Sequence, residues 1–155
     1  MEPSRKSYIS FLKKTTTIEL NSIRKDIAIR EMVENTPEIK EELYEEIIKL
    51  LKQREDSGST VVMPSVALAH VESSLIDKLI ISFGFSKRGI DDWDKENFLG
   101  KVNTIILIIF PKKGERKTYM DIIKQFIGKL ADEKYILKLS NVKCAHDIKW
   151  ALINN

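Results

Sequence analysis

His70 and Arg54 are the two residues of this sequence whose types and spacing best suit a shared chemical site. Arg54 opens the segment Arg-Glu-Asp-Ser-Gly-Ser-Thr, and His70 follows it by sixteen residues. Neutral imidazole is a good nucleophile near physiological pH, and a planar guanidinium pairs well with phosphoryl oxygens. The two residues therefore indicate nucleophilic attack on phosphorus by His70, with Arg54 holding the phosphoryl group.

Hydroxyl groups follow Arg54 within the same segment. Ser59 and Thr60 can donate hydrogen bonds to phosphoryl oxygens, although serine and threonine are equally common in turns that bind nothing. Arg54 has a structural alternative as well, because a cation stabilises the C-terminal end of its own helix. A lone histidine such as His70 is often a buried structural residue. Both interpretations of each residue stay open at this point.

Metal chemistry is not expected of this sequence. His70 has no cysteine partner, no second histidine nearby and no paired acid. Cys144 and His146 together supply only two ligands, which is too few for a zinc site. We therefore predict no metal and no other cofactor.

The composition is typical of one folded domain. The 155 residues are 43% hydrophobic and 32% charged, and the net charge of +3 gives no reason to expect a nucleic-acid partner. Cys144 is the single cysteine, so no intrachain disulfide forms and a reducing cytoplasm is the simplest setting. The longest apolar run, Ile105–Phe110, is too short to cross a bilayer. Direct membrane insertion is not expected, although the domain could belong to a larger transporter.

Helices and strands alternate around Arg54 and His70. The start signal Thr36-Pro37 predicts a helix that runs to Arg54, and extended pieces at 60–63 and 66–68 lead to His70. Residues 1–16 are predicted to be a flexible N-terminal arm, with a short helical turn at 8–12 as the alternative, followed by a single domain at 17–155. The other predicted strands are 17–20, 78–85 and 102–110, and the other predicted helices are 25–33, 117–131, 132–139 and 147–153. This alternation predicts the α/β class (α+β in some schemes), with helices on both faces of a mixed sheet in a three-layer α/β/α sandwich.

Several segments carry a family resemblance through their shared order and spacing. They are Arg54, the turn Gly58-Ser59-Thr60 and His70, together with residues 25–33, 51–55, 91–93, 105–111 and 130–132. In this combination the sequence resembles the enzyme IIA domain of the fructose, mannitol and nitrogen-regulatory branch of the sugar phosphotransferase system (PTS EIIA type-2). The resemblance implies a mannitol enzyme IIA-like fold in which His70 accepts a phosphoryl group from the carrier protein HPr.

Two departures from the family pattern bear on activity. The family commonly has Pro-His followed by a small residue, whereas this chain has Ala69-His70-Val71. Many members carry a second histidine after the core strand, and Tyr119 stands at or beside that place here. A tyrosine hydroxyl can hydrogen-bond imidazole or phosphate, but it does not titrate near pH 7. Tyr119 is therefore predicted to support His70, with half-buried packing as the alternative.

The resemblance implies two classes of function. In the first, the chain is a phosphotransferase component with a phosphohistidine intermediate at His70, in which Arg54 neutralises charge and Ser59 and Thr60 bind phosphoryl oxygens. Its donor is an HPr-like protein, and its phosphoryl group passes to a IIB domain or membrane transporter or serves as a regulatory signal. In the second, the chain is a non-catalytic regulatory module acting on an ion transporter or a transcription regulator. The departures at Ala69 and Tyr119 favour the second class.

Overall fold

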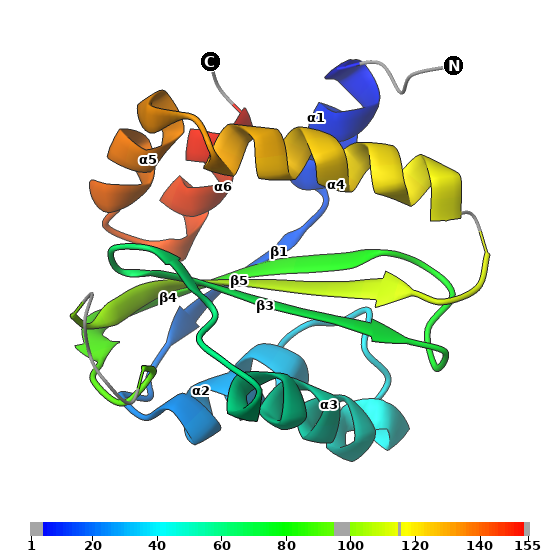
Figure 1. Ribbon diagram of the computed structural model, residues 1–155, viewed down its shortest axis with the longest axis horizontal. Coiled ribbons are helices and arrows are strands. Elements are labelled where there is room, and N and C mark those ends of the chain that lie inside the picture. Colours follow the sequence, from blue (N-terminus) through cyan, green and yellow to red (C-terminus); the bar gives the residue numbers. More distant parts are fainter. Residues whose placement is uncertain (1–4, 95–99, 115, 154–155) are drawn as a thin grey trace.

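A five-stranded mixed sheet lies between two layers of helices (Figure 1). The computed structural model describes residues 5–94, 100–114 and 116–153. The strands are β1 Thr16–Leu20, β2 Val61–Met63, β3 Val66–Ser73, β4 Ile80–Ile90 and β5 Val102–Pro111. The helices are α1 Arg5–Lys13, α2 Lys25–Glu34, the 3-10 helix η1 Glu41–Leu43, α3 Tyr44–Asp56, α4 Arg116–Leu130, α5 Glu133–Ser140 and α6 Ala145–Ile153. In Figure 1, α2 and α3 cover the lower face of the sheet and α1, α4, α5 and α6 cover the upper face. The predicted three-layer α/β/α sandwich is confirmed. None of the described helices is long and apolar enough to cross a membrane.

Strand β5 forms the centre of the sheet. The strand order is β1-β4-β5-β3-β2, and β5 is antiparallel to β4 and parallel to β3. At the two outer positions, β1 is parallel to β4 and β2 is antiparallel to β3. All of β5 is buried except the partly exposed Asn103. The predicted strand with apolar cover on both faces is therefore confirmed.

The two faces of β5 contribute to two separate hydrophobic cores. Its odd-numbered side chains from Ile105 to Ile109 pack with residues of α2 and α3 in what we term the lower core. Its even-numbered side chains from Ile106 to Phe110 pack with residues of α1, α4 and α6 in the upper core. Because successive side chains of a strand point to opposite faces, the register of β3 against β5 decides which β3 residues reach each helix layer.

The segment predicted as a flexible arm contains a packed helix. Residues 1–4 of that arm lie outside the described part of the chain, but residues 5–13 form α1. Tyr8 and Leu12 are fully buried in the upper core, and burial raises the pKa of the Tyr8 hydroxyl. The prediction of an arm is therefore wrong for residues 5–13. The helical turn considered for 8–12 is part of this helix, which is stabilised chiefly by tertiary packing because it is so short.

We expect Leu12→Ala to lower the free energy of unfolding by about 2–5 kcal/mol, because it deletes a buried side chain and leaves a cavity. Chemical denaturation measures this loss. Lys13→Ala, one residue along and exposed, is the matched control and should change stability little. Equal and negligible effects of the two substitutions would contradict the docking of α1.

The predicted helix start at Thr36 is also corrected. The helix that reaches Arg54 begins at Tyr44, after η1, and not at Pro37. Thr36 is fully buried, and its hydroxyl donates to the carbonyl of Met32 at 2.6 Å and shares a hydrogen bond with the Ser82 hydroxyl at 3.0 Å. Thr36 thus completes the end of α2 and joins it to the sheet. Because the Thr36 hydroxyl makes these contacts, it does not cap the start of a following helix, which is the role that its local sequence favours.

Candidate functional site

His70 lies in the middle of strand β3 with its side chain on the upper face. It pairs with Ile108 of β5, and its neighbours Ala67 and Ala69 are buried in the lower core. The alternation along the strand therefore directs His70 upward, where the side chain is exposed. Strand β2 pairs with β3 only at Val66 and Ala67, so β3 is the outermost described strand at His70. The imidazole is consequently accessible to another protein from the edge of the sheet.

The surroundings of His70 favour its neutral form. Desolvation by the surrounding protein is the largest influence and lowers the pKa of His70. The charge of Glu72 acts in the opposite direction, and the positive charge of Arg54 lowers the pKa further. The imidazole is therefore neutral at pH 7 and has a lone pair available on one ring nitrogen. This is the protonation state that nucleophilic attack requires.

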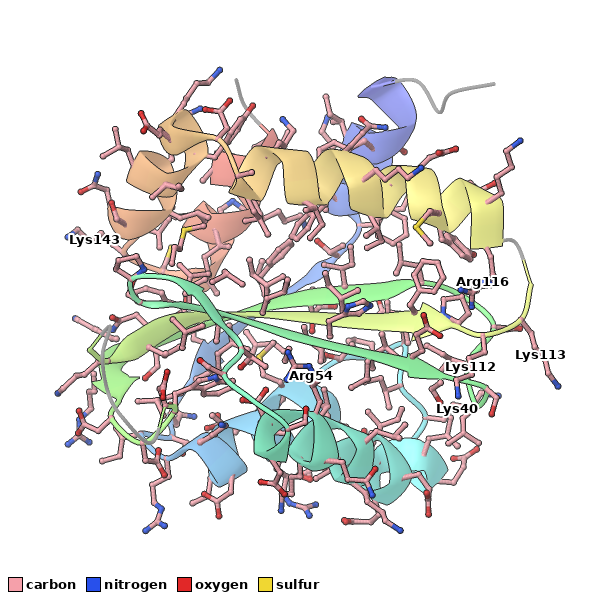
Figure 2. All side chains as sticks on the ribbon, viewed as in Figure 1. Lys40, Arg54, Lys112, Lys113, Arg116 and Lys143 are labelled. Atoms are coloured by element: carbon pink, nitrogen blue, oxygen red, sulfur yellow. The ribbon has the colours of Figure 1, made fainter. Side chains whose placement is uncertain are left out.

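Arg54 lies in the last turn of α3, between that helix and the sheet in the view of Figure 2. Its Nη1 donates to the carbonyl oxygen of Gly58 at 3.2 Å and to the Ser57 hydroxyl at 3.3 Å. It forms no ion pair with a carboxylate in the described part of the chain. The helix-end role weighed from the sequence is thus present, because Arg54 binds the chain that leaves α3. Its positive charge lowers the pKa of His70, and a single site that contains both residues stays a prediction.

Ser59 and Thr60 have protein partners in this arrangement. The Ser59 hydroxyl donates to Asp94 at 2.9 Å and accepts from the Val61 amide at 3.2 Å. The Thr60 hydroxyl is buried, donates to Glu55 at 2.8 Å and accepts from the indole nitrogen of Trp93 at 2.8 Å. Both hydroxyls therefore hold the turn that follows Arg54 and are not directed to a ligand in this state.

A buried ion pair lies beneath that turn. The ammonium of Lys25, the first residue of α2, is 2.7 Å from Glu55 Oε1 and also donates to the Trp93 carbonyl at 2.7 Å. The Glu55 side chain is only 5% exposed, and its Oε2 is buried without a hydrogen-bond partner among the described residues. A buried carboxylate requires such compensation, since removing a charge from water is costly. The pair connects α2, the end of α3 and Trp93, and so determines where Arg54 is held.

Glu72 and Arg116 were not found by sequence reasoning. Glu72 lies two residues after His70 on the same face of β3, and its Oε1 is 3.8 Å from Nη2 of Arg116. Arg116 begins α4, donates from Nη1 to the Pro111 carbonyl at 3.0 Å and stacks over the Phe110 ring at 4.9 Å. Figure 2 shows it at the end of the sheet near Lys112 and Lys113. The two-residue period of a strand was the signal for Glu72, whereas no local signal connects Arg116 to the site.

A family model matches almost the whole chain. Residues 6–155 match the model of the family described as phosphoenolpyruvate-dependent sugar phosphotransferase system, EIIA 2. The chain belongs to this EIIA 2 family. The resemblance identified from the order and spacing of residues is therefore confirmed.

Solved structures share the fold of this EIIA 2 domain. The nitrogen regulatory protein IIA-Ntr from Neisseria meningitidis has a TM-score of 0.68 and 16% identity, covering 91% of this chain and 94% of that chain. IIA mannitol from Escherichia coli has a TM-score of 0.57 and 17% identity, covering 90% and 96%. The Escherichia coli complex of enzyme IIAMTL with phosphorylated enzyme IIBMTL has a TM-score of 0.56 and 17% identity, covering 89% and 93%. The predicted mannitol enzyme IIA-like fold is confirmed.

Tyr119 lies in the first two turns of α4 of this EIIA 2 domain. It is half-buried and packs against the upper core, so it lies in the helix layer toward which His70 points. Packing was the alternative interpretation of Tyr119, and the structure shows that contact. A hydrogen bond from its hydroxyl to His70 stays a prediction.

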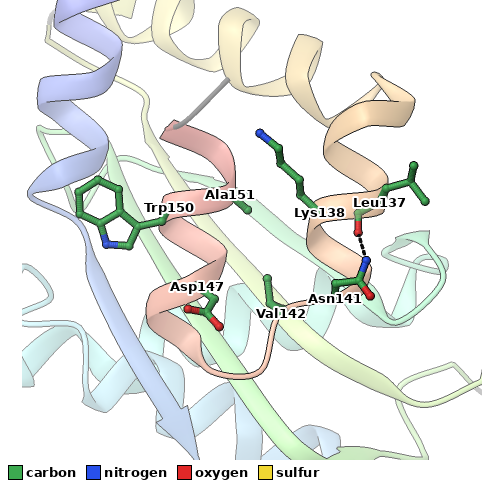
Figure 3. Close-up of a pocket in the computed structure, with 7 residues that line it drawn as sticks. All are labelled: Leu137, Lys138, Asn141, Val142, Asp147, Trp150 and Ala151. Atoms are coloured by element: carbon green, nitrogen blue, oxygen red, sulfur yellow. Dashed lines mark hydrogen bonds between the residues drawn. The ribbon is translucent and has the colours of Figure 1, made fainter.

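The largest of the described pockets lies away from His70. It has a volume of about 570 Å³ and is open between α5 and α6 (Figure 3). Leu137 and Trp150 are exposed on its rim, and Lys138 and Asp147 are its charged residues. No residue predicted for the site lines it, so the size of a pocket does not locate the chemistry of this EIIA 2 domain. No group of three or more described His, Cys, Asp or Glu residues is arranged to hold a metal ion.

We expect Glu72→Gln to lower the pKa of His70 further, below its ordinary value of about 6.5. The substitution removes the negative charge of Glu72, which raises the pKa of His70 in the native protein. An NMR titration of the imidazole C–H resonances measures the change. Glu133→Gln, at an exposed position at the start of α5, should leave the midpoint in place. An unchanged or higher midpoint in Glu72→Gln would show that Glu72 does not act on His70.

Proposed function

We propose that this EIIA 2 domain is a phosphocarrier that accepts a phosphoryl group from an HPr-like protein on His70. The observation that supports this most directly is the exposed, neutral imidazole within reach of the charge of Arg54. Membership of a phosphotransferase-system family makes phosphorus the electrophile. The reaction occurs in the cytoplasm, where the domain has protein partners and no nucleic-acid partner. It requires no metal or other cofactor, because the bond to be broken is already a reactive phosphoramidate.

The transfer proceeds by in-line displacement. The unprotonated ring nitrogen of His70 attacks the phosphorus of the donor phosphohistidine, the new N–P bond forms, and the donor's N–P bond breaks. The guanidinium of Arg54 moves from its bonds with Ser57 and Gly58 to the equatorial phosphoryl oxygens, where its planar donors match their geometry. Ser59 and Thr60 support this movement by holding the turn. The Tyr119 hydroxyl donates a hydrogen bond to the imidazole or to the phosphoryl group. A structure of the phosphorylated protein distinguishes these two contacts.

The phosphoryl group then passes to a IIB domain, which is free-standing or part of a membrane transporter. Support comes from the solved complex in which enzyme IIAMTL, a protein of the same fold, is bound to phosphorylated enzyme IIBMTL. The similar fold of IIA-Ntr, named as a nitrogen regulatory protein, supports an alternative outcome. In that case the domain is a regulatory module for an ion transporter or transcription regulator, and phosphorylation of His70 is either its signal or absent.

Incubation with enzyme I, HPr and phosphoenolpyruvate should add one phosphoryl group, detected by intact mass spectrometry. We expect the product to be acid-labile, to be absent from His70→Ala and to form normally in the control His146→Ala. The rate should rise with pH through a single midpoint below about 6.5, because the neutral imidazole is the nucleophile and its pKa is lowered. Lack of a mass shift with a competent HPr would favour the non-catalytic regulatory module.

Arg54→Lys should slow phosphorylation roughly 10- to 100-fold while changing the melting temperature little. Lysine keeps the charge but lacks the planar guanidinium that can donate two parallel hydrogen bonds. We therefore expect a smaller loss of rate than the roughly 10²–10³-fold loss that follows removal of a hydrogen-bond donor to the transition state. Rapid-quench kinetics and thermal denaturation measure the two effects on one sample. Lys52→Arg, an exposed position on the same helix, is the control. A large loss of stability with an unchanged rate would assign Arg54 to the end of α3 alone.

A further inference from the structure

A second pocket lies on the upper side of the sheet, at the end where β3 begins. It has a volume of about 500 Å³, and its polar wall consists of Ser65, Lys87, Asn103, Thr104, Ser140 and Lys143. Ser65 precedes β3, and Asn103 and Thr104 lie near the start of the parallel strand β5. His70 is five residues along β3 from Ser65, or about 16 Å at the usual strand rise. The pocket is therefore separate from the phosphoryl-transfer site.

The pocket is positively charged. Lys87 and Lys143 are its charged residues, and no carboxylate is among the described residues that line it. Neither ammonium group forms an ion pair or hydrogen bond within the described part of the chain. Figure 2 shows Lys143 at the opposite end of the sheet from Arg116, and neither Lys87 nor Lys143 is among the charges that shift the pKa of His70. Two unpaired cations facing one cavity match a ligand with two negative charges.

A buried hydroxyl at the base of the pocket has no partner. Thr104 is 1% exposed and its Oγ1 accepts or donates no hydrogen bond among the described residues. A buried polar atom without a partner is unfavourable. Rotation about χ1 would exchange Oγ1 with the methyl group or hydrogen on Cβ, and it would break no hydrogen bond. Thr104 is thus free to turn its hydroxyl to a ligand in the cavity.

The remaining polar groups are held in place by backbone contacts. Ser65 has a φ of 67°, which is unfavourable for a residue other than glycine. Its carbonyl accepts from the amides of Asn103 and Thr104 at 2.9 and 3.0 Å, which compensates for this conformation. The Asn103 side chain donates to the Ser86 carbonyl at 2.8 Å and retains its oxygen as an acceptor. The pocket therefore presents fixed hydroxyl and amide groups as well as charge.

We propose that this pocket binds a small organic phosphate that carries hydroxyl groups. Lys87 and Lys143 contact the phosphate dianion, and Thr104 turns to donate its hydroxyl to a phosphate oxygen. Ser65, Ser140 and the Asn103 oxygen meet the hydroxyl groups of the ligand. At the end of α5, the amides of Asn141 and Val142 donate hydrogen bonds to two helix carbonyls. These carbonyl oxygens are therefore not free to repel the anion. The site does not depend on phosphorylation of His70.

Isothermal titration of the full chain with glycerol 3-phosphate, in a buffer without phosphate, tests the site. We expect binding that glycerol does not reproduce and that inorganic phosphate reproduces more weakly. The double variant Lys87→Met/Lys143→Met should weaken it at least tenfold, while His70→Ala and the exposed control Lys49→Met on α3 leave it unchanged. No binding in the millimolar range, equal binding of inorganic phosphate, or equal affinity in the double-lysine variant would overturn the proposal.

Thr104→Val separates a ligand-binding role from a structural one. Valine has the same shape and removes only the unpartnered hydroxyl, so the melting temperature of the free protein should rise by about 2–4 °C. Affinity for glycerol 3-phosphate should fall at least threefold in the same variant. A more stable variant with unchanged affinity would overturn the assignment of Thr104 to the site.

Discussion

The register of β3 against β5 is the constraint on which the site depends. Pairing of His70 with Ile108 directs the imidazole to the upper face, whereas Ala69 and Val71 point to the lower core. A shift of one residue would bury the imidazole beneath α3 and expose the alanines. The register is maintained by apolar packing on both faces of β5 and by the Ser65 carbonyl, which accepts two amides at the start of that strand. Access to the His70 imidazole is thus a consequence of how the centre of the sheet packs.

Arg54 depends on a second interaction, the buried pair between Lys25 and Glu55. Glu55 is the residue after Arg54, so the contacts that hold its carboxylate also hold the end of α3. Thr60 donates to the same carboxylate and accepts from Trp93, which closes the turn after the helix. Arg54 itself is held only by hydrogen bonds to that turn and by no carboxylate of the described chain. In the proposed reaction, these contacts keep the end of α3 in place while Arg54 exchanges its protein acceptors for phosphoryl oxygens.

Local patterns in the sequence were sufficient to predict most of the fold. The run from Val102 to Phe110 predicted a strand buried on both faces, because hydrophobic periodicity depends only on neighbouring residues. The same kind of signal identified α2 and the last three helices, and hence the α/β sandwich. Residue chemistry and spacing predicted His70 and Arg54 as site residues, which stays a prediction, and their order with the Gly58-Ser59-Thr60 turn identified the family. These features can be predicted from the sequence because each involves residues close in the chain.

The tertiary structure decided what depends on contacts between distant segments. Helix α1 docks through Tyr8 and Leu12, and a helix of nine residues gains its stability from such packing and not from its own sequence. The Ser59 hydroxyl binds Asp94 and the Thr60 hydroxyl binds the indole of Trp93, both of which are distant in the sequence. Arg116 likewise lies close to Glu72 on the upper face. By itself the sequence determined most of the elements and the family, and it supplied His70 and Arg54 as candidates for the site. The folded chain alone determined which charges surround the imidazole, because desolvation and Coulomb interactions depend on distances in space.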